Sequence, residues 1–257
     1  MRIVIIGSGN TASVLGRKIK TAGHEILQVY SRHLYNAAEL ADELGCTATH
    51  SWSEIKTDAQ LYLVALSDSV LNQLSQNWHT DKGVVVHTAG AVSKDALKNV
   101  SKNYGVLYPL QSLRKEKYDY EKIPFLTDAN NDDSLALITD FAETISTIVR
   151  YANDDDRMHL HVAAVIVNNF TNHLYALAEA FCNSSGVSFA LLKPLIIETA
   201  ERIQHFAPAN VQTGPAYRGD INTLATHMSL LKEHPSLLAL YKQITESIQT
   251  ATAIPVI

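Results

Sequence analysis

The chain has 257 residues, of which 46% are hydrophobic, and a formal net charge of -5 from 21 basic and 26 acidic residues. This length allows one large domain or two modest ones. The acidic balance and the lack of a basic run argue against nucleic acid or an anionic membrane as the main partner. The longest apolar runs, such as residues 61–66 and 162–167, are too short to cross a bilayer.

The first residues lack the layout of a signal peptide, because an apolar strand pattern begins directly after Met1. The two cysteines, Cys46 and Cys182, lie far apart in apolar surroundings. We therefore expect a cytoplasmic protein with reduced cysteines and with no membrane or nucleic-acid partner.

Residues 2–6 (RIVII) have the branched-apolar pattern of a strand buried on both faces. A glycine turn follows, and then apolar positions at helical spacing. This order of strand, turn and helix suits a dinucleotide pyrophosphate: the first glycine permits the turn, the second lets the phosphates approach, and the helix presents free N–H groups. Ala12 stands at the third glycine position. The predicted cofactor contacts are Gly7, Ser8, Gly9, Asn10 and Thr11.

Residues 25–30 predict a second strand, and the positions after it bear on the choice of cofactor. No acidic residue occurs from Ile26 to Ala38, whereas Ser31, Arg32 and His33 can all donate hydrogen bonds. An acidic residue here accepts the ribose 2′-hydroxyl of NAD, and an arginine accommodates the 2′-phosphate of NADP. We therefore predict NADP over NAD, with contacts from Ser31 and Arg32. The alternative is that Arg32 is an ordinary solvated loop residue.

The remaining elements of the first half continue the alternation of strand and helix. A helix is predicted at 36–44, a weak strand at 46–50, and strands at 61–66, 84–87 and 105–108. Ligands of open parallel sheets lie beyond the carboxyl ends of the strands, so we expect loops 67–69, 87–90 and 109–112 to face the cofactor. Each is also a plausible turn without function. The predicted contacts in them are Ser67, Asp68, Thr88, Gly90 and Pro109.

Residues 67–69 can also cap a helix that carries Val70, Leu71 and Leu74. A strand at 123–126, a helix at 134–145 and a strand at 148–151 complete the first domain. The predicted fold class is α/β, a Rossmann-like domain with a mostly parallel, doubly wound sheet, followed by an all-α domain.

The acidic stretch 153–156 marks the predicted boundary between a cofactor-binding domain at 1–152 and a helical domain at 153–257. Helices are predicted at 158–182, at 187–206 with Pro194 near its start, at 220–234 and at 236–251. Several of these helices have broad apolar faces, more than a compact bundle of this size needs. We expect part of that surface to pair with a second subunit in a two-fold homodimer.

Two polar residues on the long helix are candidates for chemistry. His161 and Asn169 are eight residues apart, hence near one face, with Val165 between them. A hydrogen-bonded pair inside the core is the alternative interpretation. His159 and His161 point apart on a helix, and no cysteine or carboxylate completes a set of ligands, so we expect no metal site.

A second polar group occupies the stretch TGPAYRGDINT at 213–223. Asp220 can cap the next helix, which would place Thr223 and His227 on one face. Arg218 can clamp a carboxylate or phosphate, so Arg218 and His227 are candidates for holding an anionic substrate group. The alternative is an Arg–Asp loop with a structural role.

These pieces resemble two-domain bacterial NADP oxidoreductases that carry a helical domain of uncharacterised function. The resemblance rests on IVIIGSGN, HTAGAVS, LYPLQSL, HVAAVIVNNF, LLKPLIIET and TGPAYRGDINT, which together span nearly the whole chain. More distantly the chain is similar to pyrroline-5-carboxylate reductases and to 6-phosphogluconate and 3-hydroxyisobutyrate dehydrogenases. The resemblance implies NAD(P) binding, most simply NADP, and a homodimer whose helical domains interlock.

The distant dehydrogenases use a lysine and an asparagine on the equivalent helix. Asn169 fits the second role, but no lysine lies between Arg157 and Cys182. This departure leaves His161 as the residue of that helix that can exchange protons at neutral pH. We therefore predict an NADP-dependent oxidoreductase that moves hydride between the nicotinamide and a small carbonyl, imine or alcohol substrate. The alternatives are an inactive NADP-binding regulator or sensor, and a Rossmann domain kept only as a dimerisation scaffold.

Overall fold

The computed structural model describes residues 1–117 and 120–253, and its contacts divide the chain into two compact units, Met1–Asn169 and Phe170–Ile257. The sequence predicts a boundary at residue 152. The last strand does end at Tyr151, but the first unit also contains the helix that follows it. The two units are described separately below.

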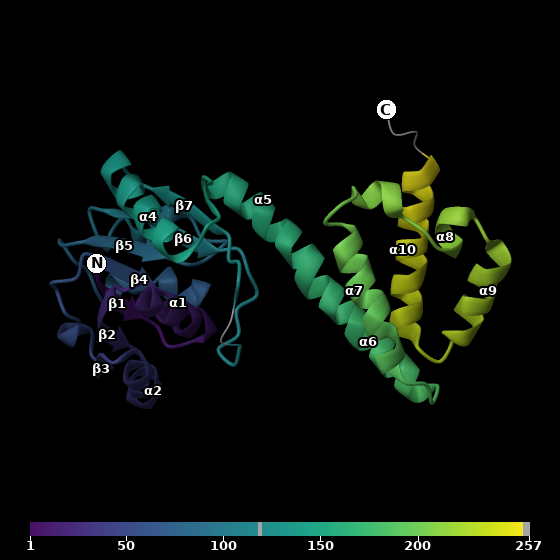
Figure 1. Cartoon of the computed structure of the whole chain (residues 1–257), viewed down its shortest axis with the longest axis horizontal. Helices are drawn as coiled ribbons and strands as arrows, with labels where there is room; N and C mark the ends of the chain where they lie inside the picture. Colours follow the sequence, from purple (N-terminus) through teal and green to yellow (C-terminus); the bar gives the residue numbers. More distant parts are fainter. Residues whose placement is uncertain (118–119, 254–257) are drawn as a thin grey trace. The chain divides into compact units, whose positions relative to one another are not determined.

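The first unit is built on one eight-stranded sheet with the strand order β3-β2-β1-β4-β5-β6-β7-β8 (Figure 1). Neighbouring strands are parallel except β6 and β7, which pair antiparallel. The predicted α/β fold class with a mostly parallel sheet is thus confirmed. The strands are β1 (Arg2–Ile6), β2 (Glu25–Tyr30), β3 (Thr47–Thr49), β4 (Leu61–Val64), β5 (Val84–His87), β6 (Tyr104–Pro109), β7 (Phe125–Ala129) and β8 (Val149–Tyr151).

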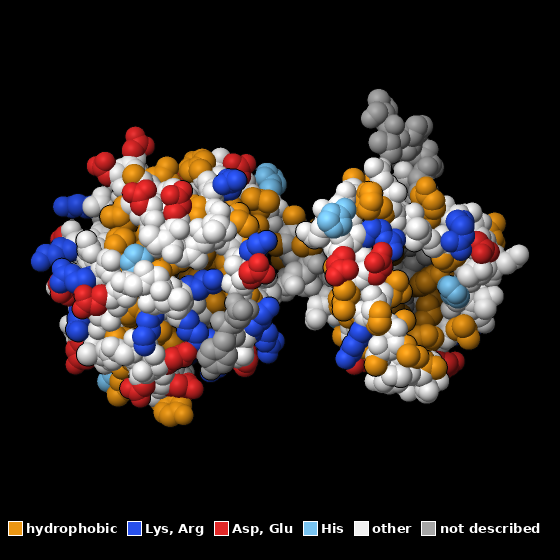
Figure 2. Space-filling view, in the orientation of Figure 1, with side chains coloured by type: hydrophobic (Ala, Val, Ile, Leu, Met, Phe, Trp, Pro, Cys, Tyr) orange, Lys and Arg blue, Asp and Glu red, His pale blue; other side chains and the backbone are white. Residues whose placement is uncertain are grey.

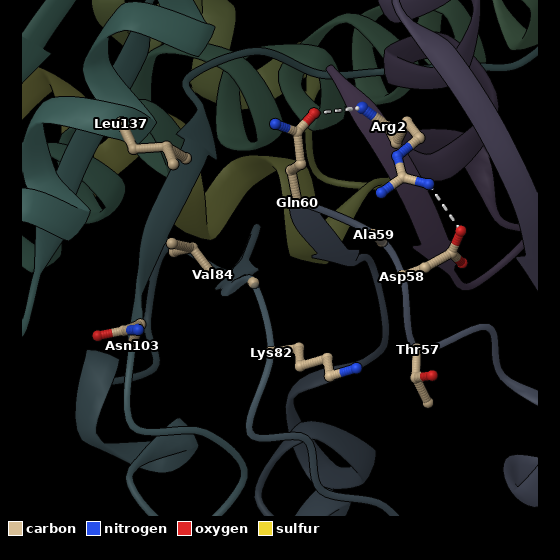
Figure 3. Close-up of a pocket in the computed structure, with 10 residues that line it drawn as sticks. Arg2, Thr57, Asp58, Ala59, Gln60, Lys82, Val84, Asn103 and Leu137 are labelled. Carbon is tan, nitrogen blue, oxygen red and sulfur yellow. Dashed lines mark hydrogen bonds and ion pairs between the residues drawn. The ribbon is translucent and has the colours of Figure 1, made fainter.

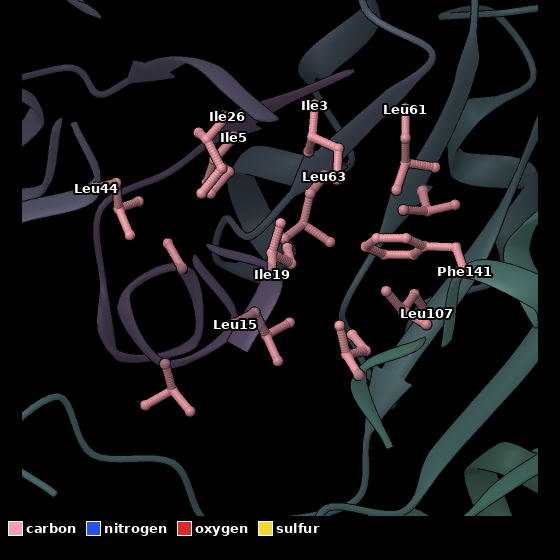
Figure 4. Packing of buried hydrophobic residues seen from close by; sticks show 14 of the residues in the cluster. Ile3, Ile5, Leu15, Ile19, Ile26, Leu44, Leu61, Leu63, Leu107 and Phe141 are labelled. Atoms are coloured by element: carbon pink, nitrogen blue, oxygen red, sulfur yellow. The ribbon is translucent and has the colours of Figure 1, made fainter. Parts of the chain in front are cut away.

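Three helices, α1 (Asn10–Thr21), α2 (Leu34–Leu44) and α4 (Asp132–Ile145), cover one face of this sheet. Alternate residues of β1 face opposite ways, so Ile3 and Ile5 meet these helices. Figure 4 shows Leu15 and Ile19 of α1 beside the sheet side chains. Burial of one such side chain contributes about 1.5–3 kcal/mol to the free energy of folding. This packing holds α1 against the sheet, so that its first turn follows directly after β1.

The opposite face is covered by shorter elements: the single turn α3 (Asp68–Leu71) and the 3₁₀ turns η1 (Trp52–Glu54), η2 (Leu74–Gln76) and η3 (Lys94–Leu97). The expected continuous helix through Leu74 is therefore wrong. Ser67 stands at its N-cap position, but its side chain makes no capping hydrogen bond. The α-helical turn ends at Leu71, and the chain continues to Leu74 in a separate 3₁₀ turn.

After β8 the first unit contains α5 (Asp154–Ala164), and the π-helical turn η4 (Val165–Phe170) leads to α6 (Thr171–Ser184) of the second unit. Asn153 caps α5 by accepting a hydrogen bond from the Asp156 amide at 2.9 Å. The remaining elements are η5 (Phe189–Leu192), α7 (Lys193–Arg202), η6 (Pro208–Val211), α8 (Pro215–Arg218), α9 (Ile221–Leu230) and α10 (Pro235–Ala253).

The predicted helix at 187–206 is wrong in extent, because only Lys193–Arg202 is α-helical. Pro194 occupies the first turn, where its missing N–H costs nothing, and it restricts the residue before it, so the chain reaches α7 through a 3₁₀ turn. In the part of the chain that the structure describes, none of the helices is both long and apolar enough to traverse a lipid bilayer.

Candidate functional site

The glycine turn between β1 and α1 has the backbone shape that a pyrophosphate needs. Gly7 has φ of +128°, and a side chain there would overlap the carbonyl oxygen of Ala65. Gly9 has an ordinary φ of -82°, and a Cβ there would meet nothing within 4 Å, so its backbone is open to an approaching group. The first turn of α1 contains no acidic residue and no side-chain cap. Its N–H groups can therefore bind an anion.

Ser8 and Ser31 connect this turn to the end of β2, because the Ser8 hydroxyl donates to the Ser31 hydroxyl at 2.8 Å. Arg32 follows Ser31 and is exposed. The parallel pairing of Ile6 with Tyr30 places these loops at the same edge of the sheet. The structure thus brings Gly7–Thr11 and the Ser31–Arg32 pair together, as the sequence predicts for a cofactor edge.

Asn10 has a role that its sequence position did not reveal. Its side-chain oxygen accepts a hydrogen bond from the Lys115 amide at 3.2 Å, and Arg17 donates to the Lys115 carbonyl at 2.6 Å. The segment after β6 is therefore tied to α1 beside the glycine turn. Thr11 is half-buried in the first turn of the same helix.

The carboxyl ends of β4, β5 and β6 lie at this same edge, since all three strands are parallel. Thr88 is half-buried, and its amide donates to the Val64 carbonyl at 3.2 Å. Ser67 and Asp68 are exposed at the start of α3. Pro109 differs from the expectation: it is the buried last residue of β6 rather than part of the following loop.

A buried charged cluster supports the loop after β5. His87 is fully buried; its Nδ1 accepts from the Ala89 amide at 3.2 Å, and its Nε2 lies 3.3 Å from the Ser93 carbonyl. Burial, helped by the nearby Arg157 charge, lowers the pKa of His87 to about 4, so the ring is neutral and Nε2–H donates to Ser93. This pair of bonds fixes the course of residues 87–93.

Arg157 on α5 is 1% exposed and donates from Nη2 to the Val92 carbonyl at 2.5 Å and to the Asp154 carboxylate at 2.7 Å. Its Nε and Nη1 have no hydrogen-bond partner among the described residues. Burial alone would raise the pKa of Asp154, but hydrogen bonds from Ser93 and Arg157 outweigh it and lower that pKa. The cluster thus attaches the start of α5 to the loop after β5.

His161, one helical turn after Arg157, meets the end of β6. The Tyr108 hydroxyl lies 3.0 Å from His161 Nδ1, and the two rings pack edge to face at 6.0 Å between centroids. Gly90 makes this contact possible, because a Cβ there would lie 2.6 Å from His161 Nδ1 and 2.8 Å from Tyr108 Cζ. The end of β6 and the loop after β5 therefore both meet the His161 ring.

A cavity of about 480 Å³ opens beside this contact. Its lining includes Tyr108, Gln111, His161 and Asn169, and none of the described lining residues is an acid, a lysine or an arginine. The sequence predicts that His161 and Asn169 share one face of the helix, and both residues do line this cavity. An uninterrupted α-helix would leave residues eight apart about 80° out of register. The π turn η4 adds one residue, which makes the offset that of a seven-residue step, about 20°.

Another hollow, of about 510 Å³, lies at the opposite edge of the sheet, at the amino ends of β1, β4 and β5 (Figure 3). Three of its polar residues are engaged with one another: Arg2 forms an ion pair with Asp58 at 2.8 Å, and the Arg2 amide donates to Gln60. Parallel α/β sheets bind ligands at the carboxyl ends of their strands, so this hollow is not the candidate site.

Arg218 and His227, the predicted anion-binding residues, belong to the second unit. Arg218 is exposed at the end of α8. Asp220 caps α9 as predicted, accepting from the Thr223 amide at 3.1 Å. His227 is half-buried, and its Nδ1 lies 2.8 Å from the Tyr241 hydroxyl. Their part in the substrate site stays a prediction.

Sequence reasoning missed Tyr108, His87 and Arg157. Tyr108 stood in a strand pattern as one more apolar residue, and His87 ended another strand. Arg157 directly follows the three aspartates of the predicted domain boundary, and nothing in that pattern indicates that it is buried.

Comparisons with known proteins agree with this architecture. The family described as "NADP oxidoreductase coenzyme F420-dependent" matches residues 2–90, and a domain of unknown function (DUF2520) matches residues 123–248. The crystal structure of a "putative NADP oxidoreductase" from Bacteroides fragilis is 36% identical, over 97% of this chain and 98% of that one, with a TM-score of 0.90. No curated protein matches the chain.

Two more distant structures share the fold. A 1-pyrroline-5-carboxylate reductase from Streptococcus pyogenes is 17% identical over 99% of both chains, with a TM-score of 0.66. An imine reductase from Myxococcus stipitatus, solved in complex with NADP⁺, is 13% identical over 97% of this chain and 95% of that one, with a TM-score of 0.67.

Proposed function

We propose that this chain, which belongs to the family of two-domain NADP oxidoreductases, reduces a small carbonyl or imine compound with NADPH, or oxidises the matching alcohol or amine. The observation that carries the proposal is the contact between Tyr108 and His161, which both line a cavity at the carboxyl ends of the strands. The solved imine reductase with NADP⁺ is a relative in fold that supports the choice of reaction.

The residues at the glycine turn fit the cofactor. The open backbone at Gly9 and the uncapped N-terminus of α1 would hold the pyrophosphate. Ser31 and Arg32 would hold the 2′-phosphate, since both follow β2 and no acid stands there. The exposed Ser67 and Asp68 after β4 and the half-buried Thr88 after β5 would lie along the rest of the dinucleotide.

This assignment predicts a change of cofactor preference in an Arg32→Asp variant. The carboxylate would repel the 2′-phosphate and accept the 2′-hydroxyl of NAD, so NADPH binding should weaken about a hundredfold and NADH binding much less. Titration with each nicotinamide, followed by its fluorescence, measures both constants. Arg2→Asp, a charge change at the opposite edge of the sheet, is the control. Equal losses for NADPH and NADH in Arg32→Asp would contradict the NADP assignment.

His161 would move the proton in the reaction. Bound NADP(H) supplies or accepts the hydride. His161 would donate a proton to the substrate oxygen or nitrogen in reduction and accept it in oxidation. Asn169 lines the same cavity and would orient the substrate through its amide. Arg218 and His227 would hold an anionic substrate group, when the substrate carries one.

Turnover with a panel of small aldehydes, ketones and cyclic imines tests the proposal against its rival, an NADP-binding sensor without catalysis. NADPH absorbance should fall with at least one compound, at a rate above the background without protein. Binding of NADPH without hydride transfer to any member of the panel would favour the sensor. The lack of a lysine between Arg157 and Cys182 is the feature that favours that rival.

We also propose a cytoplasmic homodimer formed through the helical half. Between residues 170 and 251 the buried hydrophobic side chains are only Cys182, Ala216, Leu224 and Leu231. Figure 2 shows hydrophobic side chains on the visible surface of this unit. A core this small gives little stability, so the exposed apolar surface favours a covering partner. The exposed residues include Phe170, Leu174, Leu191, Leu195, Ile197, Ile203, Phe206, Ile221 and Leu230.

Light scattering after size exclusion should therefore give about twice the 28.3 kDa of one chain. A double variant, Leu191→Glu with Leu195→Glu, places charges on residues that are 78% and 59% exposed, and should yield a monomer. Tyr35→Glu, also at a 78% exposed position but on the first unit, should leave the dimer intact. A monomeric native chain at micromolar concentration would contradict the proposal.

A further inference from the structure

Tyr108 is the one hydroxyl that the structure places against the His161 ring among the described residues. It stands near the end of β6, is 9% exposed, and lines the same cavity as His161. Burial raises the pKa of the Tyr108 phenol, although the Arg157 charge opposes this effect. The hydroxyl is therefore protonated at neutral pH, and it can donate to Nδ1 of the neutral Nε2–H tautomer or accept from Nδ1–H of the other neutral tautomer.

The same hydroxyl also suits the charged ring. A tyrosine oxygen can accept a hydrogen bond as well as donate one, so it can accept from Nδ1–H when His161 is protonated. In both states the hydrogen bond to Tyr108 engages Nδ1. Nε2 has no hydrogen-bond partner among the described residues, so it can face a substrate. A single hydroxyl thus holds the ring in one orientation through a full cycle of proton gain and loss.

Gly90 supplies the second constraint. Because any Cβ at this position would come within 2.6 Å of His161 Nδ1, the backbone of the β5 loop closes off the Nδ1 side of the ring. The His87 hydrogen bonds to Ala89 and Ser93 keep that loop in place. The ring is therefore held between the hydroxyl on β6 and the loop after β5.

We propose that Tyr108 is a positioning residue that binds His161 Nδ1 and thereby assigns Nε2 as the atom that exchanges the proton with the substrate. This inference rests on the proposed function. In reduction, the Nε2–H bond of the imidazolium would break as a bond from that hydrogen to the substrate oxygen or nitrogen forms. The neutral ring would then keep Nδ1–H on the Tyr108 oxygen, and solvent would restore the lost proton.

The test compares two Tyr→Phe variants on the same strand. Tyr108→Phe removes the hydroxyl at His161, whereas Tyr104→Phe removes one that donates to Asp95 at 3.0 Å, outside the cavity. ¹⁵N NMR of the histidine rings, with the His161 signals identified by their loss in His161→Ala, reports the bond directly. The His161 Nδ1 signal should shift in Tyr108→Phe and stay in Tyr104→Phe.

Turnover gives a second readout. Tyr108→Phe should lower kcat about tenfold and leave the NADPH dissociation constant unchanged, and it should add no further loss in a His161→Ala background. An unchanged Nδ1 signal in Tyr108→Phe, or the same shift in Tyr104→Phe, would overturn the proposal. The NMR result decides it even if no substrate is turned over, so its failure is distinct from failure of the proposed function.

Discussion

A Gly7→Ala variant is expected to lose about 3 kcal/mol or more of unfolding free energy and to bind NADPH poorly. Two costs combine at this position. The φ of +128° is a conformation that side chains rarely adopt, and the added Cβ would overlap the Ala65 carbonyl of the neighbouring loop. Because the position of the Cβ is fixed by its own backbone and the oxygen belongs to the backbone of Ala65, neither can move without displacing β1 or β4. Urea denaturation measures the loss.

Two other glycines separate these costs. Gly23→Ala also has a positive φ, +81°, but its Cβ would meet nothing within 4 Å, so it should lose only about 1 kcal/mol. Gly9→Ala has neither problem and should leave stability within about 0.5 kcal/mol. It should nevertheless weaken NADPH, since its Cβ occupies the space through which phosphate approaches. Equal destabilisation by Gly7→Ala and Gly23→Ala would show that the overlap is unimportant.

His161→Ala is expected to reduce turnover of an identified substrate by about 10²- to 10⁴-fold, the usual contribution of a general acid or base. The NADPH dissociation constant should stay near that of the native chain, because the predicted phosphate contacts lie at the glycine turn and after β2. Steady-state kinetics together with fluorescence titration distinguishes these effects. A loss confined to KM would instead mean that His161 only binds the substrate.

His159 offers a matched control for this experiment. It is an exposed histidine two residues earlier on the same helix, and positions two apart on a helix point in different directions. His159→Ala should therefore retain native turnover and stability. Turnover that survives in His161→Ala at the level of His159→Ala would refute a proton-transfer role for this part of the helix.

The strands of the sheet could be predicted well because each one has a recognisable pattern within a few consecutive residues. β2 and β5 match the predicted ranges to the residue, since each is a short apolar run with clear ends. The Asp220 cap was equally local, as side chain and amide are three residues apart. The glycine turn could be predicted because its glycines, a few residues apart in the sequence, form a recognisable local motif.

The features that could not be predicted are contacts between residues that lie far apart in the sequence. Tyr108 and His161 are 53 residues apart, and the Arg157 bond to Val92 spans 65. Nothing local distinguishes Tyr108 from its apolar neighbours in β6, or Arg157 from the charged residues before it. The predicted helix through Leu74 failed for a related reason: Leu71 is buried from the single α-helical turn α3 and Leu74 from the 3₁₀ turn η2, so their burial does not require one continuous helix.

The π turn at Val165–Phe170 has a consequence for comparing this chain with its relatives. The additional residue advances all later positions of the long helix by one place, relative to a helix without it. Against a relative whose helix lacks this turn, an alignment without a gap would pair Asn169 with a residue on a different side of that helix. In such a comparison, equivalent residues are matched by the direction of their side chains, with one gap allowed inside the turn.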